Sequence, residues 1–75
     1  AAGARDCEAA IAEARRIRSP EREAFAMARL AVNQVRAGAP AAAALTAARS
    51  LALLGRIGFG PAQIVSYLRR ARALA

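Results

Sequence analysis

The chain has 75 residues, including 12 basic residues that are all arginine, five acidic residues and no histidine, so its formal net charge is +7. A chain of this length forms one domain, residues 1–75, and buries only about 60% of the surface that its unfolded form exposes. Without histidine and with one cysteine, it lacks the usual acid–base groups, the cysteine–histidine nucleophile and zinc ligand sets. We therefore expect a protein that is not an enzyme and has no metal, cofactor or small-molecule substrate.

The single cysteine and the apolar runs bear on the cellular compartment. Cys7 cannot form an internal disulfide, which argues against a secreted disulfide scaffold. The longest apolar run, residues 40–57, is interrupted by Thr46 and Arg49 and is too short to span a bilayer. No signal peptide is visible. We expect a cytoplasmic protein without membrane partners.

The charge is unevenly distributed along the chain. Residues 1–23 hold all five acidic residues and five arginines, so their charges cancel. Residues 24–75 hold seven arginines and no acidic residue, so the whole net charge arises there. Such asymmetry indicates a polyanionic partner, which means nucleic acid, an anionic membrane surface or an acidic protein.

The first predicted helix runs from about Arg5 to Arg18. Its apolar residues recur at helical spacing and form one stripe. Glu13 and Arg16 are three residues apart, so they can pair across one turn. The stripe consists of Cys7, Ala10, Ile11, Ala14 and Ile17.

The second predicted helix has clear signals at both ends. Ser19 is a favourable N-cap and Pro20 a favourable first residue, while Gly38 suits the left-handed conformation just beyond the last turn. Most of its apolar residues form one stripe. Met27 and Leu30 lie toward the opposite side, where they are either ordinary scattered surface residues or a second contact surface for a protein partner or another copy of the chain.

The third predicted helix runs from Pro40 to Arg56 and is rich in alanine and leucine. Its leucines spread round the whole circumference, and a helix that is apolar on all sides is typically buried. These leucines are Leu45, Leu51, Leu53 and Leu54. We therefore predict an all-α fold of four helices packed around the third. Such a small alanine-rich core is typical of domains that a partner or a homodimer stabilises.

The stretch from Leu53 to Tyr67 resembles the helix-turn-helix DNA-binding family. That family places glycine in the turn, here Gly58, with large apolar residues at set spacing before and after it. The matching apolar residues are Leu53, Ile57, Phe59, Ile64 and Tyr67. One position departs, because the family has a small residue where this chain has Leu54. The resemblance implies that the fourth helix, Pro61 to about Leu74, is a recognition helix in the major groove.

The resemblance also implies roles for the outer face of this fourth helix. Gln63 and Ser66 would contact base edges. The arginines near them would contact phosphates. These phosphate-binding residues are Arg69, Arg70, Arg72 and Arg56. The predicted function is therefore DNA binding through the C-terminal helix.

Two other classes of function fit the same composition. The first is a helical protein-interaction subunit whose basic half docks on an acidic partner. The second is a cationic membrane-active peptide, because the chain is similar to circular bacteriocins in length, helicity and charge, and Ala1 and Ala75 would join within one helix. The acid-rich, amphipathic first half argues against this second alternative.

Overall fold

The computed structural model describes residues 2–74, and over these residues the chain forms four α-helices and no strand. The helices are α1 (Ala2–Arg16), α2 (Pro20–Arg36), α3 (Pro40–Arg56) and α4 (Pro61–Leu74). The predicted all-α class is confirmed. The predicted bounds of α3 and α4 agree with the structure. Helix α1 begins three residues earlier and ends two residues sooner than the predicted range from Arg5 to Arg18.

The three turns between the helices share one hydrogen-bonded geometry. Arg18, Gly38 and Gly58 have positive φ angles of 56°, 81° and 90°, at intervals of 20 residues. After each of them, a backbone N–H donates to the carbonyl five residues earlier, as in a Schellman motif. These bonds are Ser19 to Ala14 (2.9 Å), Ala39 to Gln34 (2.8 Å) and Phe59 to Leu54 (3.1 Å). A proline then begins the next helix, where its missing N–H costs no intrahelical bond.

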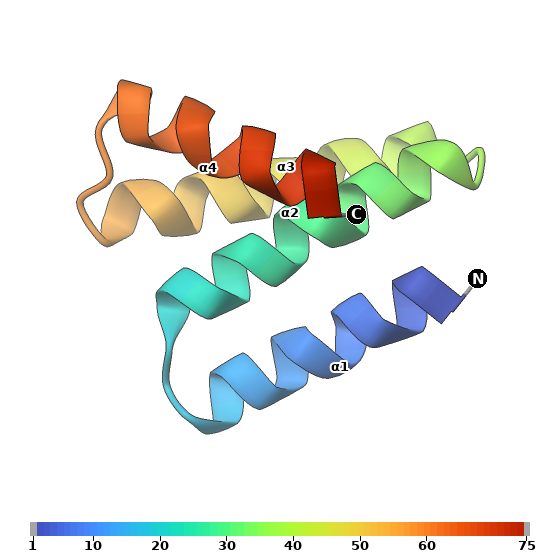
Figure 1. The fold of residues 1–75 in the computed structure, drawn as a ribbon, viewed down its shortest axis with the longest axis horizontal. Helices are drawn as coiled ribbons and strands as arrows, with labels where there is room; N and C mark the ends of the chain where they lie inside the picture. The colour runs from blue at the N-terminus through green and yellow to red at the C-terminus, as the bar shows by residue number, and fades with distance from the viewer. Residues whose placement is uncertain (1, 75) are drawn as a thin grey trace.

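The central helix is α2, and not α3 as the leucine pattern predicted. Figure 1 shows α2 between α1 on one side and α3 and α4 on the other, and each of these three packs on α2. The buried residues of α2 are Ala24, Ala26, Met27, Ala28, Leu30 and Ala31. In α3 only Ala43, Ser50 and Leu54 are buried, while Leu45 and Leu51 are 54% and 42% exposed. Most alanines of α3 lie on its exposed side, where they favour the helix without needing burial.

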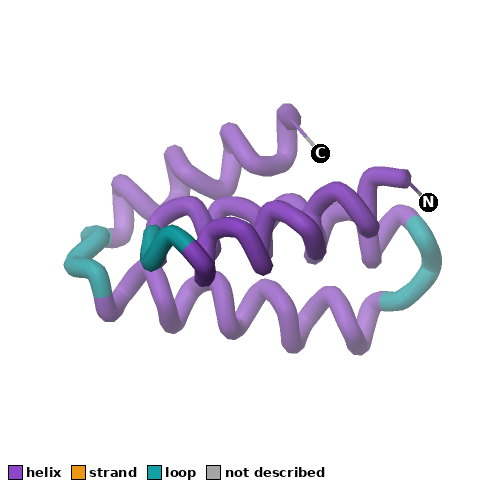
Figure 2. The backbone as a smooth tube through the Cα atoms, turned by 90° about the horizontal axis from the view of Figure 1, so that it is seen from below, coloured by secondary structure: helices purple, strands orange, loops and turns teal. Residues whose placement is uncertain are grey.

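On the side of α2 opposite α1, the helices α3 and α4 do not run parallel to each other. Figure 2, seen from the side of α1, shows α3 and α4 diverging from their shared turn. Ser50 fixes α3 on α2, because its buried hydroxyl donates to the carbonyl of Ala24 at 2.7 Å. Leu54 is fully buried in the same cluster as Ala24 and Tyr67. It is the largest side chain that is completely buried, so the core is thin.

Met27 and Leu30 belong to this core and not to a second contact surface. Their exposed fractions are 7% and 8%. Together with Ile11 of α1 and Thr46 of α3, they line the junction of the first three helices. The sequence pattern left them outside the main stripe of α2 because it allowed for one neighbouring helix, whereas α2 has neighbours on several sides.

Candidate nucleic-acid interface

The fourth helix is held on α2 mainly by Tyr67. Its hydroxyl donates to the carbonyl of Glu21 at 2.8 Å. Its ring makes edge-to-face contacts with Phe25 and Phe59, with ring centroids 5.1 and 5.3 Å apart. Such pairs contribute about 0.5–1.5 kcal/mol beyond the area that they bury. This aromatic group sets the rotation of α4, and with it the side chains that α4 turns outward.

The beginning of α4 is capped by one of the predicted base-contacting residues. The side-chain oxygen of Gln63 accepts a hydrogen bond from the backbone N–H of Gly60 at 2.8 Å. This bond satisfies a backbone donor that the helix itself cannot. The amide nitrogen of Gln63 keeps two donors, while its oxygen is already engaged.

All six predicted contact residues are exposed in the structure. At 100° per residue, Ser66 and Arg69 lie near the middle of the outer face of α4, opposite Ala71. Gln63, Ser66 and Arg70 line one shallow hollow beside Phe59. The structure does not bring the other two into this group, because Arg72 lies on the opposite flank and Arg56 ends α3. Four of the six predicted residues therefore lie together on the outer face of α4, whereas Arg56 and Arg72 lie apart from them.

The residues that carry the helix-turn-helix resemblance come together in the core. Leu53, Ile57, Phe59 and Ile64 pack against the cluster that contains Tyr67. Leu54, which departs from the family pattern, lies in this cluster beside Ala24 of α2. A large residue is accommodated there because α3 packs on α2. Both views show α4 running back in the direction opposite to α3 (Figures 1 and 2).

Two of the five arginines in residues 1–23, Arg15 and Arg16, are paired with acidic residues. Arg16 donates to both carboxylate oxygens of Glu13, at 2.9 and 2.5 Å. This bond lowers the pKa of Glu13 and raises that of Arg16. Arg15 pairs with Glu23 across the first turn at 3.0 Å. The predicted interaction between Glu13 and Arg16 is therefore confirmed.

The exposed arginines at the end of α3 and along α4 are not in ion pairs with other described residues, unlike Arg15 and Arg16. Within residues 2–74, no carboxylate lies within ion-pair distance of Arg56, Arg69 or Arg72. Arg70 has an internal contact, since its guanidinium lies 5.8 Å from the centre of the Phe25 ring. This charge also lowers the pKa of Tyr67, but burial of the phenol and the charge of Glu21 raise it more.

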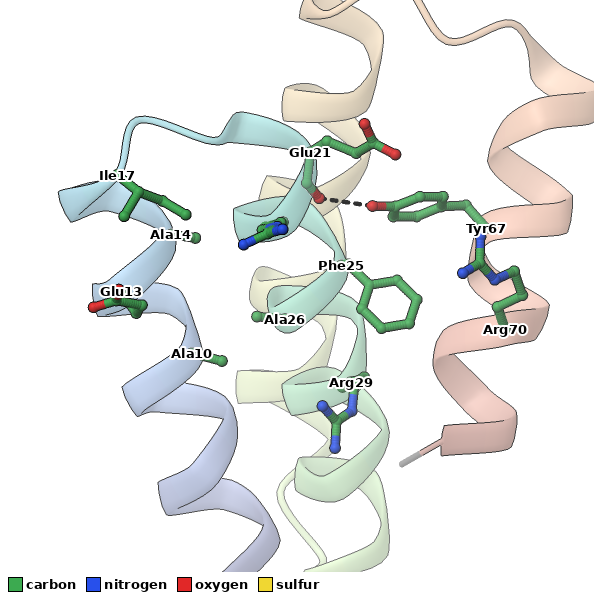
Figure 3. Close-up of a pocket in the computed structure, with 11 residues that line it drawn as sticks. Ala10, Glu13, Ala14, Ile17, Glu21, Phe25, Ala26, Arg29, Tyr67 and Arg70 are labelled. Atoms are coloured by element: carbon green, nitrogen blue, oxygen red, sulfur yellow. Dashed lines mark hydrogen bonds between the residues drawn. The ribbon is translucent and has the colours of Figure 1, made fainter.

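Sequence reasoning missed a groove on the other side of Arg70. It opens between α1 and α4, with α2 as its floor (Figure 3). The residues from α2 include Arg22, Phe25, Ala26 and Arg29, whose spacing puts them on one helix face. That spacing was visible in the sequence, but nothing there showed that α1 and α4 leave this face partly uncovered.

Metal-binding groups and membrane-spanning helices were also sought in the part of the chain that the structure describes. Over residues 2–74, no group of three or more histidine, cysteine, aspartate or glutamate side chains is placed to hold a metal ion. None of the four described helices is long and apolar enough to cross a membrane. Comparisons of the chain with protein-family models, curated proteins and solved structures found no match.

Proposed function

We propose that this chain binds nucleic acid through the outer face of α4. The observation that supports this is the exposure of Arg56, Arg69 and Arg72 without carboxylate partners in the described chain, in a half of the sequence that has no acidic residue. An exposed arginine without an internal partner presents its planar donors to phosphate, which they match in a bidentate geometry.

The arrangement of charges on α4 suits a helix in a major groove. Arg69 is near the centre of the outer face, and Arg70 and Arg72 lie on opposite flanks. A groove about 12 Å wide has phosphates along both edges, so the arginines of the outer face would contact the backbones while Gln63 and Ser66 face the bases. Because the oxygen of Gln63 caps α4, its amide nitrogen would donate to purine acceptors such as N7.

A second candidate function is binding to an acidic protein. Val65 is 51% exposed and lies one turn before Arg69 on the outer face of α4. An apolar side chain beside arginines is common in protein interfaces, where aromatic and apolar groups are buried and charges form the rim. Contact with phosphates gives no use for this valine.

The test compares duplex DNA with poly-glutamate as ligands for the folded chain over a range of salt concentrations. Nucleic-acid binding predicts an affinity for DNA that falls steeply with salt, by a slope of about 0.9 for each phosphate contacted. Poly-glutamate should bind more weakly at every salt concentration. Equal affinities for both ligands, or binding of DNA that does not change with salt, would contradict the proposal.

A further inference from the structure

Most of the groove between α1 and α4 is left unused by the proposed function. Its volume is about 410 Å³, within the range of about 300–1,000 Å³ of small-molecule sites. The α1 wall presents Ala10, Ala14 and Ile17, and the floor presents Phe25 and Ala26 (Figure 3). Ile17 is 41% exposed, although it belongs to the apolar stripe of the first helix. The apolar surface that the groove leaves accessible therefore comes mainly from Ala10, Ile17 and Phe25, because Ala14 and Ala26 are only 2% and 3% exposed.

The accessible surface of the whole molecule is somewhat larger than expected for its size. It measures 4899 Å², whereas a folded monomer of 7.8 kDa is expected to expose about 4,400 Å². Over the described residues, α1 and α4 each pack on α2, and no extensive contact joins α1 to α4.

The rim of the groove is positively charged. Arg22 and Arg29 approach it from α2, and Arg70 approaches it from α4, where its guanidinium lies over Phe25. Figure 3 shows Arg29 and Arg70 on two different sides of the Phe25 ring. Cations thus surround the apolar floor.

Two acidic residues also line the groove, but neither cancels this charge. Glu13 is already engaged by Arg16 through two hydrogen bonds. Glu21 lies at the end of the groove where α2 begins, and Figure 3 shows its carboxylate beyond the Tyr67 hydroxyl. The middle of the groove therefore combines apolar walls with an excess of guanidinium groups.

We propose that this groove binds a long-chain carboxylate, with the alkyl chain on the α1 wall and the carboxylate on the rim arginines. The charge complementarity is specific, because a guanidinium binds a carboxylate through two parallel hydrogen bonds. The wall from Ala10 to Ile17 is about 10 Å long, which is two helical turns. A nucleic-acid backbone would gain nothing from the apolar wall.

The two proposed sites share Arg70, but Ile17, Arg22 and Arg29 are outside the outer face of α4, so the groove can be tested separately from nucleic-acid binding. The probe is dodecanoate below its micelle concentration, followed by two-dimensional NMR of the isotopically labelled chain. We expect saturable shifts of the backbone amide signals of Ala10, Ala14 and Ala26. Dodecyltrimethylammonium has the same chain length and a positive head group, so it should not produce saturable shifts.

Two matched double variants separate the groove from α4. Ile17→Ser with Arg22→Gln removes one apolar side chain and one charge from the groove, and should weaken dodecanoate binding by roughly tenfold. Val65→Ser with Arg72→Gln makes the same kind of change on α4, and should leave dodecanoate affinity unchanged while weakening DNA binding. Far-ultraviolet circular dichroism checks that both variants remain helical.

Several results would overturn the groove proposal. Equal loss of dodecanoate affinity in both double variants would show that the ligand responds to general charge and hydrophobicity. Equal affinity for dodecyltrimethylammonium would remove the role of the arginines. Saturable shifts of the groove signals by an acidic helical peptide, without any by dodecanoate, would assign the groove to a protein partner. None of these results depends on whether DNA binds α4.

Discussion

The two halves of the molecule use arginine in different ways. In the first half, Arg15 and Arg16 form ion pairs with Glu23 and Glu13. In the second half, Arg69 and Arg72 are exposed and have no carboxylate partner among the described residues. Folding thus neutralises charge only where the acidic residues lie nearby in sequence, and the charge asymmetry of the chain becomes an asymmetry of the folded surface.

The same contrast separates structural from ligand-binding roles. Exposed ion pairs contribute little to stability, so the pairs of Arg15 and Arg16 mainly offset charge locally. Arg5, Arg18 and Arg22 of the first half are also exposed and form no ion pair within the described residues. The two halves therefore differ in net charge, because the second half has no acidic residue to offset its arginines.

The largest loss of stability should come from weakening the contact between α3 and α2. Leu54→Ala removes a fully buried side chain where α3 meets α2, and should lower the free energy of unfolding by about 2–5 kcal/mol. Leu45→Ala, at a position 54% exposed, should change it by less than about 0.5 kcal/mol. Urea denaturation followed by circular dichroism measures both. Similar losses would mean that α3 does not dock through Leu54.

A smaller effect should distinguish the turns of the two halves. The first turn places Arg18 at a positive φ angle, whereas the last places Gly58 in the same position. Gly58→Ala should destabilise the chain by about 1 kcal/mol, because an L side chain is strained there. Arg18→Gly should stabilise it by roughly 0.5 kcal/mol for the same reason. Thermal unfolding of both variants tests this, and a loss of stability in Arg18→Gly would count against it.

The smallest effect should appear in the titration of Tyr67, where the halves meet. Burial raises its pKa above the ordinary value of 10.0, the charge of Glu21 raises it further, and Arg70 lowers it. Because the folded pKa is the higher one, this stabilisation is complete below the unfolded pKa and is lost as the pH rises through the folded value.

Substitution of the two charged neighbours should therefore move the pKa of Tyr67 in opposite directions. Arg70→Gln should raise it, and Glu21→Gln should lower it. Tyr67 is the only tyrosine, so the ultraviolet absorbance of tyrosinate reports it without interference. An unchanged titration in Arg70→Gln would place the Arg70 guanidinium away from the aromatic group.

The local structure was largely predictable from the sequence, and the packing was not. Proline and glycine marked three helix boundaries, because each acts on backbone geometry within a few residues. The choice of central helix failed because the leucines of α3 suggested burial on all sides, whereas the small residues of α2 allow several helices to approach it. Alanine contributes equally well to an exposed helix and to a close contact, so composition could not distinguish the two.

The candidate site was predictable in part for similar reasons. The exposure of Ser66 and Arg69 follows from helical spacing relative to Tyr67 and Ala71, and the structure agrees with it. The capping role of Gln63 and the contact of Arg70 with Phe25 depend on side-chain positions in three dimensions. The groove depends on the separation of two helices that are far apart in the sequence.

The most direct test of the account compares DNA binding by two double variants that each remove two positive charges. Arg69→Gln with Arg72→Gln should reduce the dependence of log affinity on log salt concentration by about 1.8, since each lost phosphate contact contributes about 0.9. Arg15→Gln with Arg16→Gln should leave that slope unchanged, because these arginines are already paired with Glu23 and Glu13. Equal slopes for the two variants would contradict the claim that folding leaves the charge of the second half free for a polyanion.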